Sequence, residues 1–187
     1  MIIGVLFSAI VILGSFFIKK YSKDIPNFSI NPISKSKNKE KKISSRIKQF
    51  GIKIDKINLI VPVVKNVNGT DKNIYNKELK KGVAHLKGSA LPGGGSNIFI
   101  FGHSSAFIGS GPYSEIFSKL NNLKWQDKIT VFYRNKKFNY SVFEKEIVEK
   151  NDISVIKPTK EEELTLMTCW PIGTNKKRLI IKAKLLD

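Results

Sequence analysis

Cysteine and histidine are scarce in this sequence: Cys169 is the single cysteine, and His85 and His103 are the two histidines. One cysteine excludes a disulfide within the chain and leaves a buried structural thiol, a free reactive thiol, or a link to another chain. A lone cysteine in a strand is most often a small buried hydrophobic residue, so composition alone favours an inert thiol. Acid–base chemistry by imidazole is restricted to two positions.

Acidic residues are also few. Fifteen Asp and Glu oppose 33 Lys and Arg, which gives a formal net charge of +18. A field of that size attracts polyanions, whether nucleic acid, anionic lipid headgroups or cell-wall polymers, and charge alone does not choose among them. The abundance of Lys, Asn and Ile also fits a genome rich in A and T. With 41% hydrophobic residues over 187 positions, the composition excludes wholesale disorder and suffices for one domain with a hydrophobic core.

A long apolar run occurs once, at residues 2–18, and ends at Lys19 and Lys20. Its length is about the minimum for a transmembrane helix. We predict a transmembrane anchor over 1–18, because the charged n-region and the A-x-A-like cleavage site of a signal peptide, the alternative, are missing. The positive charges after the run would, by the positive-inside rule, place the C-terminal part in the cytoplasm.

Residues 19–50 differ in character from the anchor. They are rich in Lys, Ser and Asn, contain Pro26 and Pro32, and include the run SKSKNKEKK at 34–42, which has no apolar side chain. Such a segment is typical of a solvated linker. We predict a basic flexible tether over 19–50.

From Gly51 onward the pattern changes to short apolar and β-branched runs, which favour strands. The polar pair Asn135-Lys136 predicts a hairpin turn, and the spacing of Ile116, Phe117 and Leu120 predicts a helix over 113–122. Many short strands with little helix indicate one mainly β domain over 51–187, a closed barrel or a sandwich. The predicted strands are 57–64, 97–101, 128–134, 137–143, 153–156, 163–168 and 178–186.

One segment combines the cysteine with a cation. Residues 165–178 are consistent with a strand ending near Cys169, a loop, and a second strand starting near Arg178. If the two strands pair, both residues lie at the same end of the sheet. A nearby cation favours the reactive thiolate, and Arg can donate hydrogen bonds to a developing oxyanion.

A histidine would complete this set, because imidazole transfers protons near neutral pH. His103 follows the apolar strand NIFIFG and opens a loop of small residues, so it lies at a strand tip. His85 lies in GVAHLKGSALPG, where we predict no strand to orient it. We therefore select His103 as the partner of Cys169.

These residues carry a family resemblance. TLMTC at 165–169, the arginine nine residues later and the Gly-His pair after an apolar strand resemble the sortase signature of TLxTC, a downstream Arg and an upstream catalytic His. GVAHLKGSALPGGGSNIFIFGH at 82–103 and FSKLNNLKWQDKITV at 117–131 resemble further family segments. The resemblance covers roughly residues 55–187.

The resemblance implies a closed eight-stranded sortase-type β-barrel with one or two short helices, held outside the cytoplasmic membrane by the N-terminal helix. This location overrides the positive-inside argument. The catalytic residues would be His103, Cys169 and Arg178, with Thr168 and Arg178 at the oxyanion or substrate site. The implied partners are secreted proteins with a C-terminal sorting signal and an amine acceptor, from a peptidoglycan precursor or another protein. No nucleic acid is expected.

The implied reaction is acyl transfer through a cysteine thioester. It requires no metal or organic cofactor, and the sequence gives no indication about calcium. Three departures from relatives stand out: Ser104 follows the Gly-His pair where many have Arg, no Asp-Pro-aromatic lid motif occurs in 19–50, and no second hydrophobic helix occurs at the C-terminus. The last two favour a housekeeping-like or single-substrate enzyme over a pilin polymerase.

Two alternatives remain. An L,D-transpeptidase would have His two residues before the cysteine, where Met167 stands. A membrane-tethered basic β-barrel that binds anionic polymer without catalysis would need aromatic and basic residues on an exposed strand face. VFYRNKKFNY at 131–140 supplies such residues, but the period-two pattern of Phe138, Tyr140 and Val142 is explained more simply by core packing.

Overall fold

The computed structural model describes residues 33–107 and 109–186. The predicted anchor at 1–18 lies outside these residues, as does the first part of the predicted tether. The chain divides into two units, 1–39 and 40–187, and the description below concerns the second, together with the helix that begins at Ile33. No helix in the described ranges has both the length and the apolar character needed to cross a membrane.

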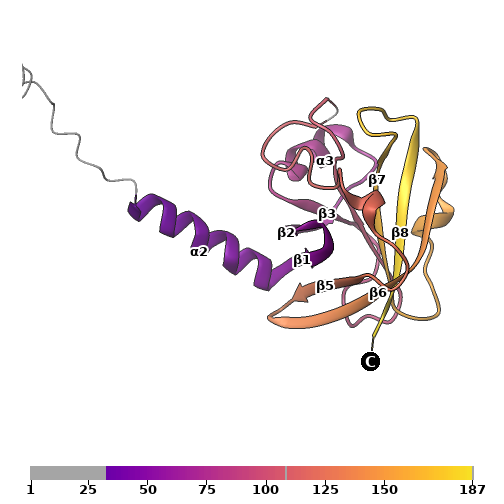
Figure 1. Ribbon diagram of the computed structural model, residues 1–187, viewed down its shortest axis with the longest axis horizontal. Coiled ribbons are helices and arrows are strands. Elements are labelled where there is room, and N and C mark those ends of the chain that lie inside the picture. Colours follow the sequence, from indigo (N-terminus) through magenta and orange to yellow (C-terminus); the bar gives the residue numbers. More distant parts are fainter. Residues whose placement is uncertain (1–32, 108, 187) are drawn as a thin grey trace, which may run out of the picture. The chain divides into compact units, whose positions relative to one another are not determined.

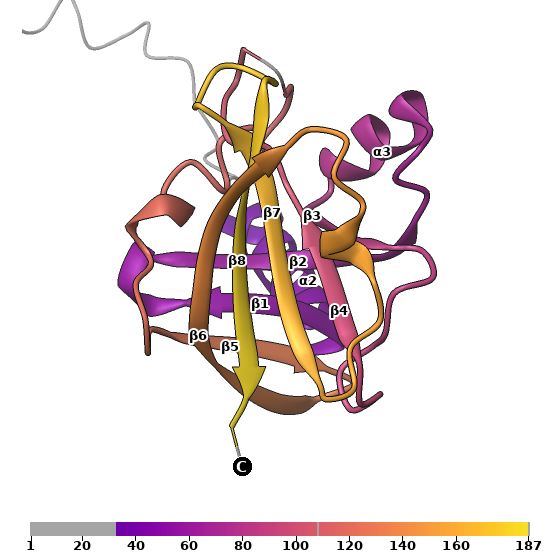
Figure 2. The same cartoon turned by 90° about the vertical axis from the view of Figure 1, so that its right-hand side faces the viewer.

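Eight strands form a closed barrel in the order β1-β2-β3-β4-β7-β8-β6-β5 (Figures 1 and 2). Neighbouring strands are antiparallel except the pairs β2–β3 and β4–β7, which are parallel. The barrel confirms the fold that the resemblance implied. The strands are β1 (Phe50–Ile54), β2 (Leu59–Val67), β3 (Val83–Leu86), β4 (Asn97–Phe101), β5 (Lys128–Tyr133), β6 (Lys136–Glu149), β7 (Glu163–Trp170) and β8 (Lys177–Leu185).

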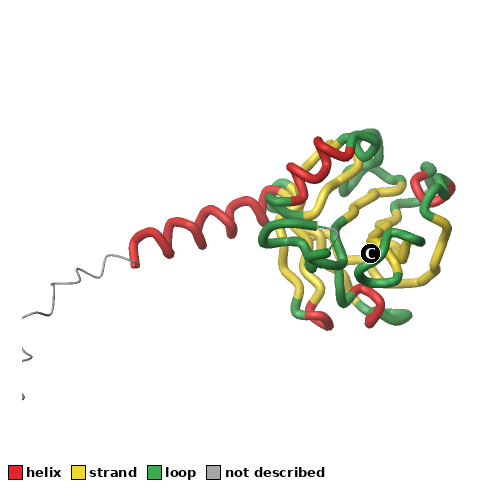
Figure 3. Tube along the Cα trace, turned by 90° about the horizontal axis from the view of Figure 1, so that it is seen from above, coloured by secondary structure: helices red, strands yellow, loops and turns green. Residues whose placement is uncertain are grey.

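The helical segments are α2 (Ile33–Gln49), α3 (Lys72–Leu79) and three 3-10 turns, η1 (Asp55–Ile57), η2 (Leu120–Asn122) and η3 (Ser154–Ile156). Asp71 caps α3, because its carboxylate accepts hydrogen bonds from the N–H groups of Asn73 and Ile74. Figure 3 shows α3 and the 3-10 turns outside the ring of strands. Most of the second unit is therefore a single closed sheet.

Alternate side chains of the strands fill the barrel, as the period-two geometry of strands requires. A second apolar cluster covers the outer surface of β4, β7 and β8, where Phe99, Phe101 and Ile180 pack with Leu79 of α3 and Val155 of η3. Strand β4 is therefore buried on both faces, which explains its uninterrupted apolar sequence. Fully buried interior residues include Ile52, Ile54, Val61, Val83, Ile98, Ile100, Leu164, Leu166 and Ile181.

The aromatic run at 131–140 belongs to the β5–β6 hairpin. Tyr140 and Val142 are buried, and Phe138 packs against the interior cluster. These three side chains are therefore core residues, as the period-two pattern predicted, and not an exposed binding stripe.

The structure corrects the prediction of a flexible tether for residues 33–49, which form α2. From residue 40 on, this helix belongs to the same compact unit as the barrel, and its Ile47 is only 9% exposed. Tertiary packing of one apolar side chain thus stabilises a helix that the polar composition did not indicate.

Two further predictions of secondary structure are wrong. Of the predicted strand 153–156, residues 154–156 form η3 instead, and Ile153 precedes it as the N-cap. Residues 113–122 form successive turns that end in η2 instead of an α-helix, because their hydrogen bonds join an N–H to the carbonyl three residues earlier, as in Ser118 to Glu115 and Leu120 to Phe117. Strands β1 and β3 were not predicted.

Candidate active site

Strand register brings the three predicted catalytic residues to one end of β4, β7 and β8. In the antiparallel β7–β8 pair, Cys169 lies directly opposite Arg178. In the parallel β4–β7 pair, Phe101 lies opposite Met167, and the Gly102 N–H donates to the Met167 carbonyl at 3.1 Å. His103 is two residues beyond Phe101 and Cys169 two residues beyond Met167, so the two residues follow neighbouring strand positions at the same end of the sheet.

Two hydrogen bonds join the segment that carries His103 to the strand that carries Cys169. The Thr168 hydroxyl, buried in the barrel, donates to the Gly102 carbonyl at 2.9 Å. The Ser104 hydroxyl, also buried, donates to the Cys169 carbonyl at 3.1 Å. These contacts fix the backbone on both sides of His103. Because the Thr168 hydroxyl is bonded here, it positions the backbone, and its place at an oxyanion site stays a prediction.

Two glycines allow close packing around His103. A Cβ atom on Gly102 would lie 2.9 Å from the ring of Phe117, whose N–H donates to the His103 carbonyl at 3.0 Å. A Cβ atom on Gly109 would lie 2.5 Å from the His103 ring. Such contacts would force the neighbouring rings to shift, so both positions favour glycine: Gly102 lies against Phe117 and Gly109 lies against the imidazole.

Burial sets the proton positions of the pair. It lowers the pKa of His103 below the usual histidine value. It also raises the pKa of the Cys169 thiol, and the charge of Arg178 opposes that rise only in part. Both shifts favour a neutral thiol beside a neutral imidazole at pH 7.

Arg178 is half-buried and turned toward its own loop. Its Nη1 donates to the backbone carbonyls of Lys177 at 2.9 Å and Asn175 at 3.1 Å. The remaining N–H groups of the guanidinium keep donor capacity for a substrate oxygen. Its predicted role at an oxyanion stays a prediction, whereas its electrostatic effect on the thiol follows from the register of β7 and β8.

A polar cleft of about 350 Å³ lies against His103. Four side chains of α3 and its C-terminal end line it, together with Gly109 and Ser110. The sequence analysis missed this cleft, although one signal was present: Asn73, Asn76, Lys77 and Lys80 recur at spacings of three and four residues, which places them on one face of a helix.

His85, the histidine that was not selected, lies in β3 and is completely buried. The Asn66 N–H donates to its Nδ1 at 3.3 Å, so Nε2 carries the hydrogen and donates to the Ala90 carbonyl at 2.8 Å. The expectation that no strand orients it is wrong, because β3 was missed. Burial lowers the pKa of His85. Both ring nitrogens hold backbone groups, which is a structural role.

Within residues 33–107 and 109–186, no three His, Cys, Asp or Glu side chains come together in an arrangement that could hold a metal ion. Cys169, His103 and Arg178 bring a thiol, an imidazole and a guanidinium to this end of the sheet. Acyl transfer through a thioester would use such groups, and their roles stay predictions.

Comparisons with known proteins agree with this architecture. The sortase domain family matches residues 52–186. Sortase D of Bacillus subtilis (strain 168) is 33% identical over 71% of this chain and 61% of its own length. Sortase A of Bacillus anthracis is 28% identical over 72% of this chain and 58% of its own length. The chain therefore spans about three fifths of the length of these relatives.

Solved structures show the same fold. Sortase A from Corynebacterium diphtheriae superposes with a TM-score of 0.62 at 30% identity, covering 76% of this chain and 62% of that one. Sortase C1 from Streptococcus agalactiae has a TM-score of 0.61 at 31% identity, covering 73% and 66%. Both A-type and C-type sortases are thus similar to it. With its domain match, its barrel and its relatives in accord, the chain belongs to the sortase family.

Proposed function

We propose that this protein is a sortase-type transpeptidase that uses Cys169 as nucleophile. The observation that carries the proposal is the register of β4, β7 and β8, which sets Cys169 opposite Arg178 and brings the strand ends next to His103 and Cys169 together. The substrate would be a secreted protein with a C-terminal sorting signal, cleaved at a Thr-Gly-like bond.

Because Cys169 and His103 are both neutral at rest, the first half of the reaction begins with a proton transfer between them. His103 takes the thiol proton as the Cys169 sulfur attacks the scissile carbonyl, which avoids a free thiolate in the apolar surroundings. The oxygen of the tetrahedral intermediate gains negative charge, and the Arg178 guanidinium is the nearby cation to stabilise it. The C–N bond then breaks, His103 returns the proton to the leaving amine, and a thioester remains.

The second half runs in reverse with a new amine. The acceptor attacks the thioester, His103 removes its proton, and the C–S bond breaks with return of the proton to the Cys169 sulfur. The polar cleft beside His103 supports this step, because its Asn and Lys side chains offer hydrogen-bonding room on the histidine side of the nucleophile. We propose that the acceptor, a peptidoglycan precursor or a protein amine, approaches through it.

The proposed setting is the cell membrane. The apolar run at 2–18 would anchor the chain as a single pass, with the catalytic domain outside the cytoplasm where secreted substrates and wall precursors meet it. We also propose a housekeeping-like or single-substrate role. The support is the sequence of residues 19–50, which contains no Asp-Pro-aromatic lid motif.

A peptide screen tests the proposal. The full chain is incubated with sorting-type peptides and a soluble amine, and products are identified by mass spectrometry. We expect the N-terminal peptide fragment joined to the amine for at least one peptide, and no such product from Cys169→Ala. Ligation that persists in Cys169→Ala would refute the proposal.

A further inference from the structure

The β5–β6 turn closes the C-terminal end of α2. Arg134 and Asn135 have left-handed backbone conformations, with φ of 49° and 64°. In this conformation their N–H groups donate to the carbonyls of Gln49 and Lys48, both at 2.9 Å. The last carbonyls of a helix have no hydrogen-bond donor within the helix, and here the N–H groups of the turn are their donors. The end of α2, the start of β1 and the turn therefore form one joined corner of the second unit.

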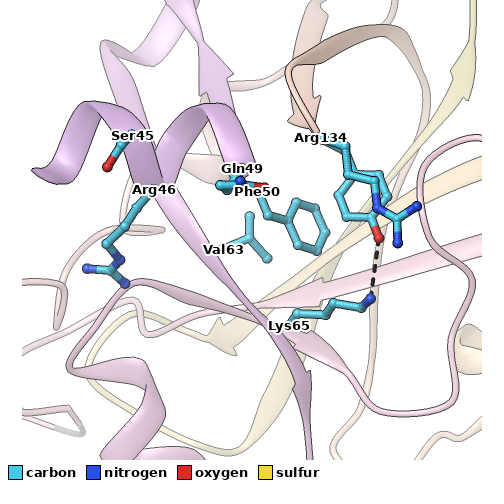
Figure 4. Close-up of a pocket in the computed structure, with 8 residues that line it drawn as sticks. Ser45, Arg46, Gln49, Phe50, Val63, Lys65 and Arg134 are labelled. Carbon is cyan, nitrogen blue, oxygen red and sulfur yellow. Dashed lines mark hydrogen bonds between the residues drawn. The ribbon is translucent and has the colours of Figure 1, made fainter.

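A cleft of about 390 Å³ opens at this corner (Figure 4). Phe50 and Val63 lie at its centre, and Arg46 lies on the opposite side of them from Arg134. Lys65 of β2 extends along the cleft, and its ammonium donates to the Tyr133 hydroxyl. The cleft thus has an apolar floor and a basic rim, and it shares no lining residue with the cleft at His103.

Two of the cations converge on the same aromatic ring. The Lys65 ammonium lies 3.3 Å from the Tyr133 hydroxyl and 5.8 Å from the centre of its ring. The Arg134 guanidinium lies 5.4 Å from the same centre. Cation–π attraction favours these positions of both side chains, which reduces the conformational entropy that they lose when they bind a ligand.

The basic rim has no acidic counterpart in the part of the chain that the structure describes. None of the ion pairs there involves Arg46, Lys65 or Arg134, and no carboxylate lines the cleft. Arg46 donates to the Lys81 carbonyl, which is a neutral partner. Lys65 of β2 and Arg134 of the β5–β6 turn lie on the same ring and repel each other, and an anion bound between them would reverse that cost.

We propose that this cleft binds a phosphate group. Guanidinium and ammonium groups recognise phosphate through short charge-assisted hydrogen bonds, and Arg offers paired donors that match two phosphate oxygens. The apolar floor fits a carbon moiety attached to that phosphate. The phosphate would come from a free anion or from an anionic lipid headgroup, and the site works independently of Cys169.

Calorimetric titration of the full chain in uncharged detergent micelles tests this site with inorganic phosphate at constant ionic strength. We expect saturable binding at one site per chain. The double variant Lys65→Gln, Arg134→Asn should weaken it about tenfold or more, because two charged donors are lost. Asn is chosen because it tolerates the left-handed conformation of the turn. The single variant Lys65→Gln, which leaves the turn untouched, should weaken binding in the same direction if the double variant does not fold.

The matched control removes the same charge elsewhere. Lys128→Gln, Lys184→Gln changes two exposed side chains on other parts of β5 and β8, and should alter binding by less than about twofold, because salt screens distant exposed charges. Addition of phosphatidylglycerol to the micelles then separates the two sources. Displacement of phosphate by the lipid identifies a headgroup site, and lack of displacement identifies a site for free phosphate. Absence of saturable phosphate binding, or an equal loss in the control variant, would overturn the proposal.

Discussion

The Ser104 hydroxyl donates a hydrogen bond to the backbone carbonyl of Cys169. Ser104, which directly follows His103, thus fixes the backbone of Cys169, the proposed nucleophile. Together with the bond from Thr168 to Gly102, it ties the end of β4 to the end of β7 through two side chains from opposite strands. The position where many relatives have Arg therefore has a defined structural role in this chain.

Ser104→Ala removes one of these two ties. We expect the free energy of unfolding to fall by about 1 kcal/mol, because one buried hydrogen bond is lost. We also expect kcat for peptide ligation to fall while KM for the peptide changes little, since the base and the nucleophile lose their alignment. Ser105→Ala is the control in the same loop, because that hydroxyl contacts the Phe107 N–H and not β7. Equal kcat in the two variants would argue against an aligning role.

Arg178→Gln should make the thiol harder to ionise. The charge of Arg178 lowers the pKa of Cys169 against the larger effect of burial, so its removal raises that pKa further. The rate of alkylation by iodoacetamide at fixed pH should fall about threefold to tenfold, since each pKa unit changes the thiolate fraction tenfold. Lys177→Gln removes the same charge from the adjacent residue, which pairs with Glu149. A similar slowing in both variants would show that Arg178 has no special effect.

Tyr140→Phe tests a contact at the other end of the barrel. The Tyr140 hydroxyl donates to Glu162 at 2.6 Å, and the same carboxylate accepts from the N–H groups of Gly93 and Gly95. Loss of a buried hydrogen bond to a charged group should cost about 2 kcal/mol in urea unfolding. Tyr113→Phe, at a partly buried tyrosine, should change stability by less than about 0.5 kcal/mol. A cost for Tyr140→Phe no larger than for Tyr113→Phe would exclude a stabilising role for this bond.

Acid should destabilise the protein through its buried histidines. Burial lowers the pKa of His85 below the value of 6.5 that it has in the unfolded chain. Below pH 6.5 the unfolded chain therefore binds a proton that the folded chain does not, and stability falls until the pH reaches the folded pKa. Each such histidine contributes up to about 1.4 kcal/mol per pH unit in this window.

Urea unfolding between pH 7 and pH 5 measures this slope, and His85→Asn should reduce it even though the variant is less stable throughout. The same dependence of unfolding free energy on pH in the wild-type protein and His85→Asn would mean that His85 has the same pKa in the folded and unfolded chain.

The sequence predicts the positions of Cys169, Arg178 and His103 relative to the sheet better than it predicts the secondary structure of residues 33–49. Strands β4, β7 and β8 have apolar or alternating runs that are long enough to be recognised, and they carry or adjoin these three residues. Once the loop between β7 and β8 is identified, antiparallel pairing of these two strands places Cys169 opposite Arg178. Local sequence was sufficient to place these residues because they lie at the ends of regular strands, and their catalytic roles stay predictions.

The errors occur where burial decides the structure. The apolar run at 153–156 fits a strand or a turn equally well. Val155 of η3 is buried because it packs against the apolar side chains on the outer face of β4 and β7. Helix α2 has a polar sequence, and its end is fixed by the β5–β6 turn, a contact between residues about 85 positions apart. Local sequence does not show that η3 packs on β4 and β7, or that the β5–β6 turn binds the end of α2.

The most direct measurement is the intact mass of the full chain after incubation with a sorting-type peptide and no acceptor amine. The proposal predicts a covalent adduct of the N-terminal peptide fragment on Cys169, released by hydroxylamine as a thioester would be, and no adduct on Cys169→Ala. An adduct on Cys169→Ala, or peptide cleavage by that variant at the wild-type rate, would contradict it.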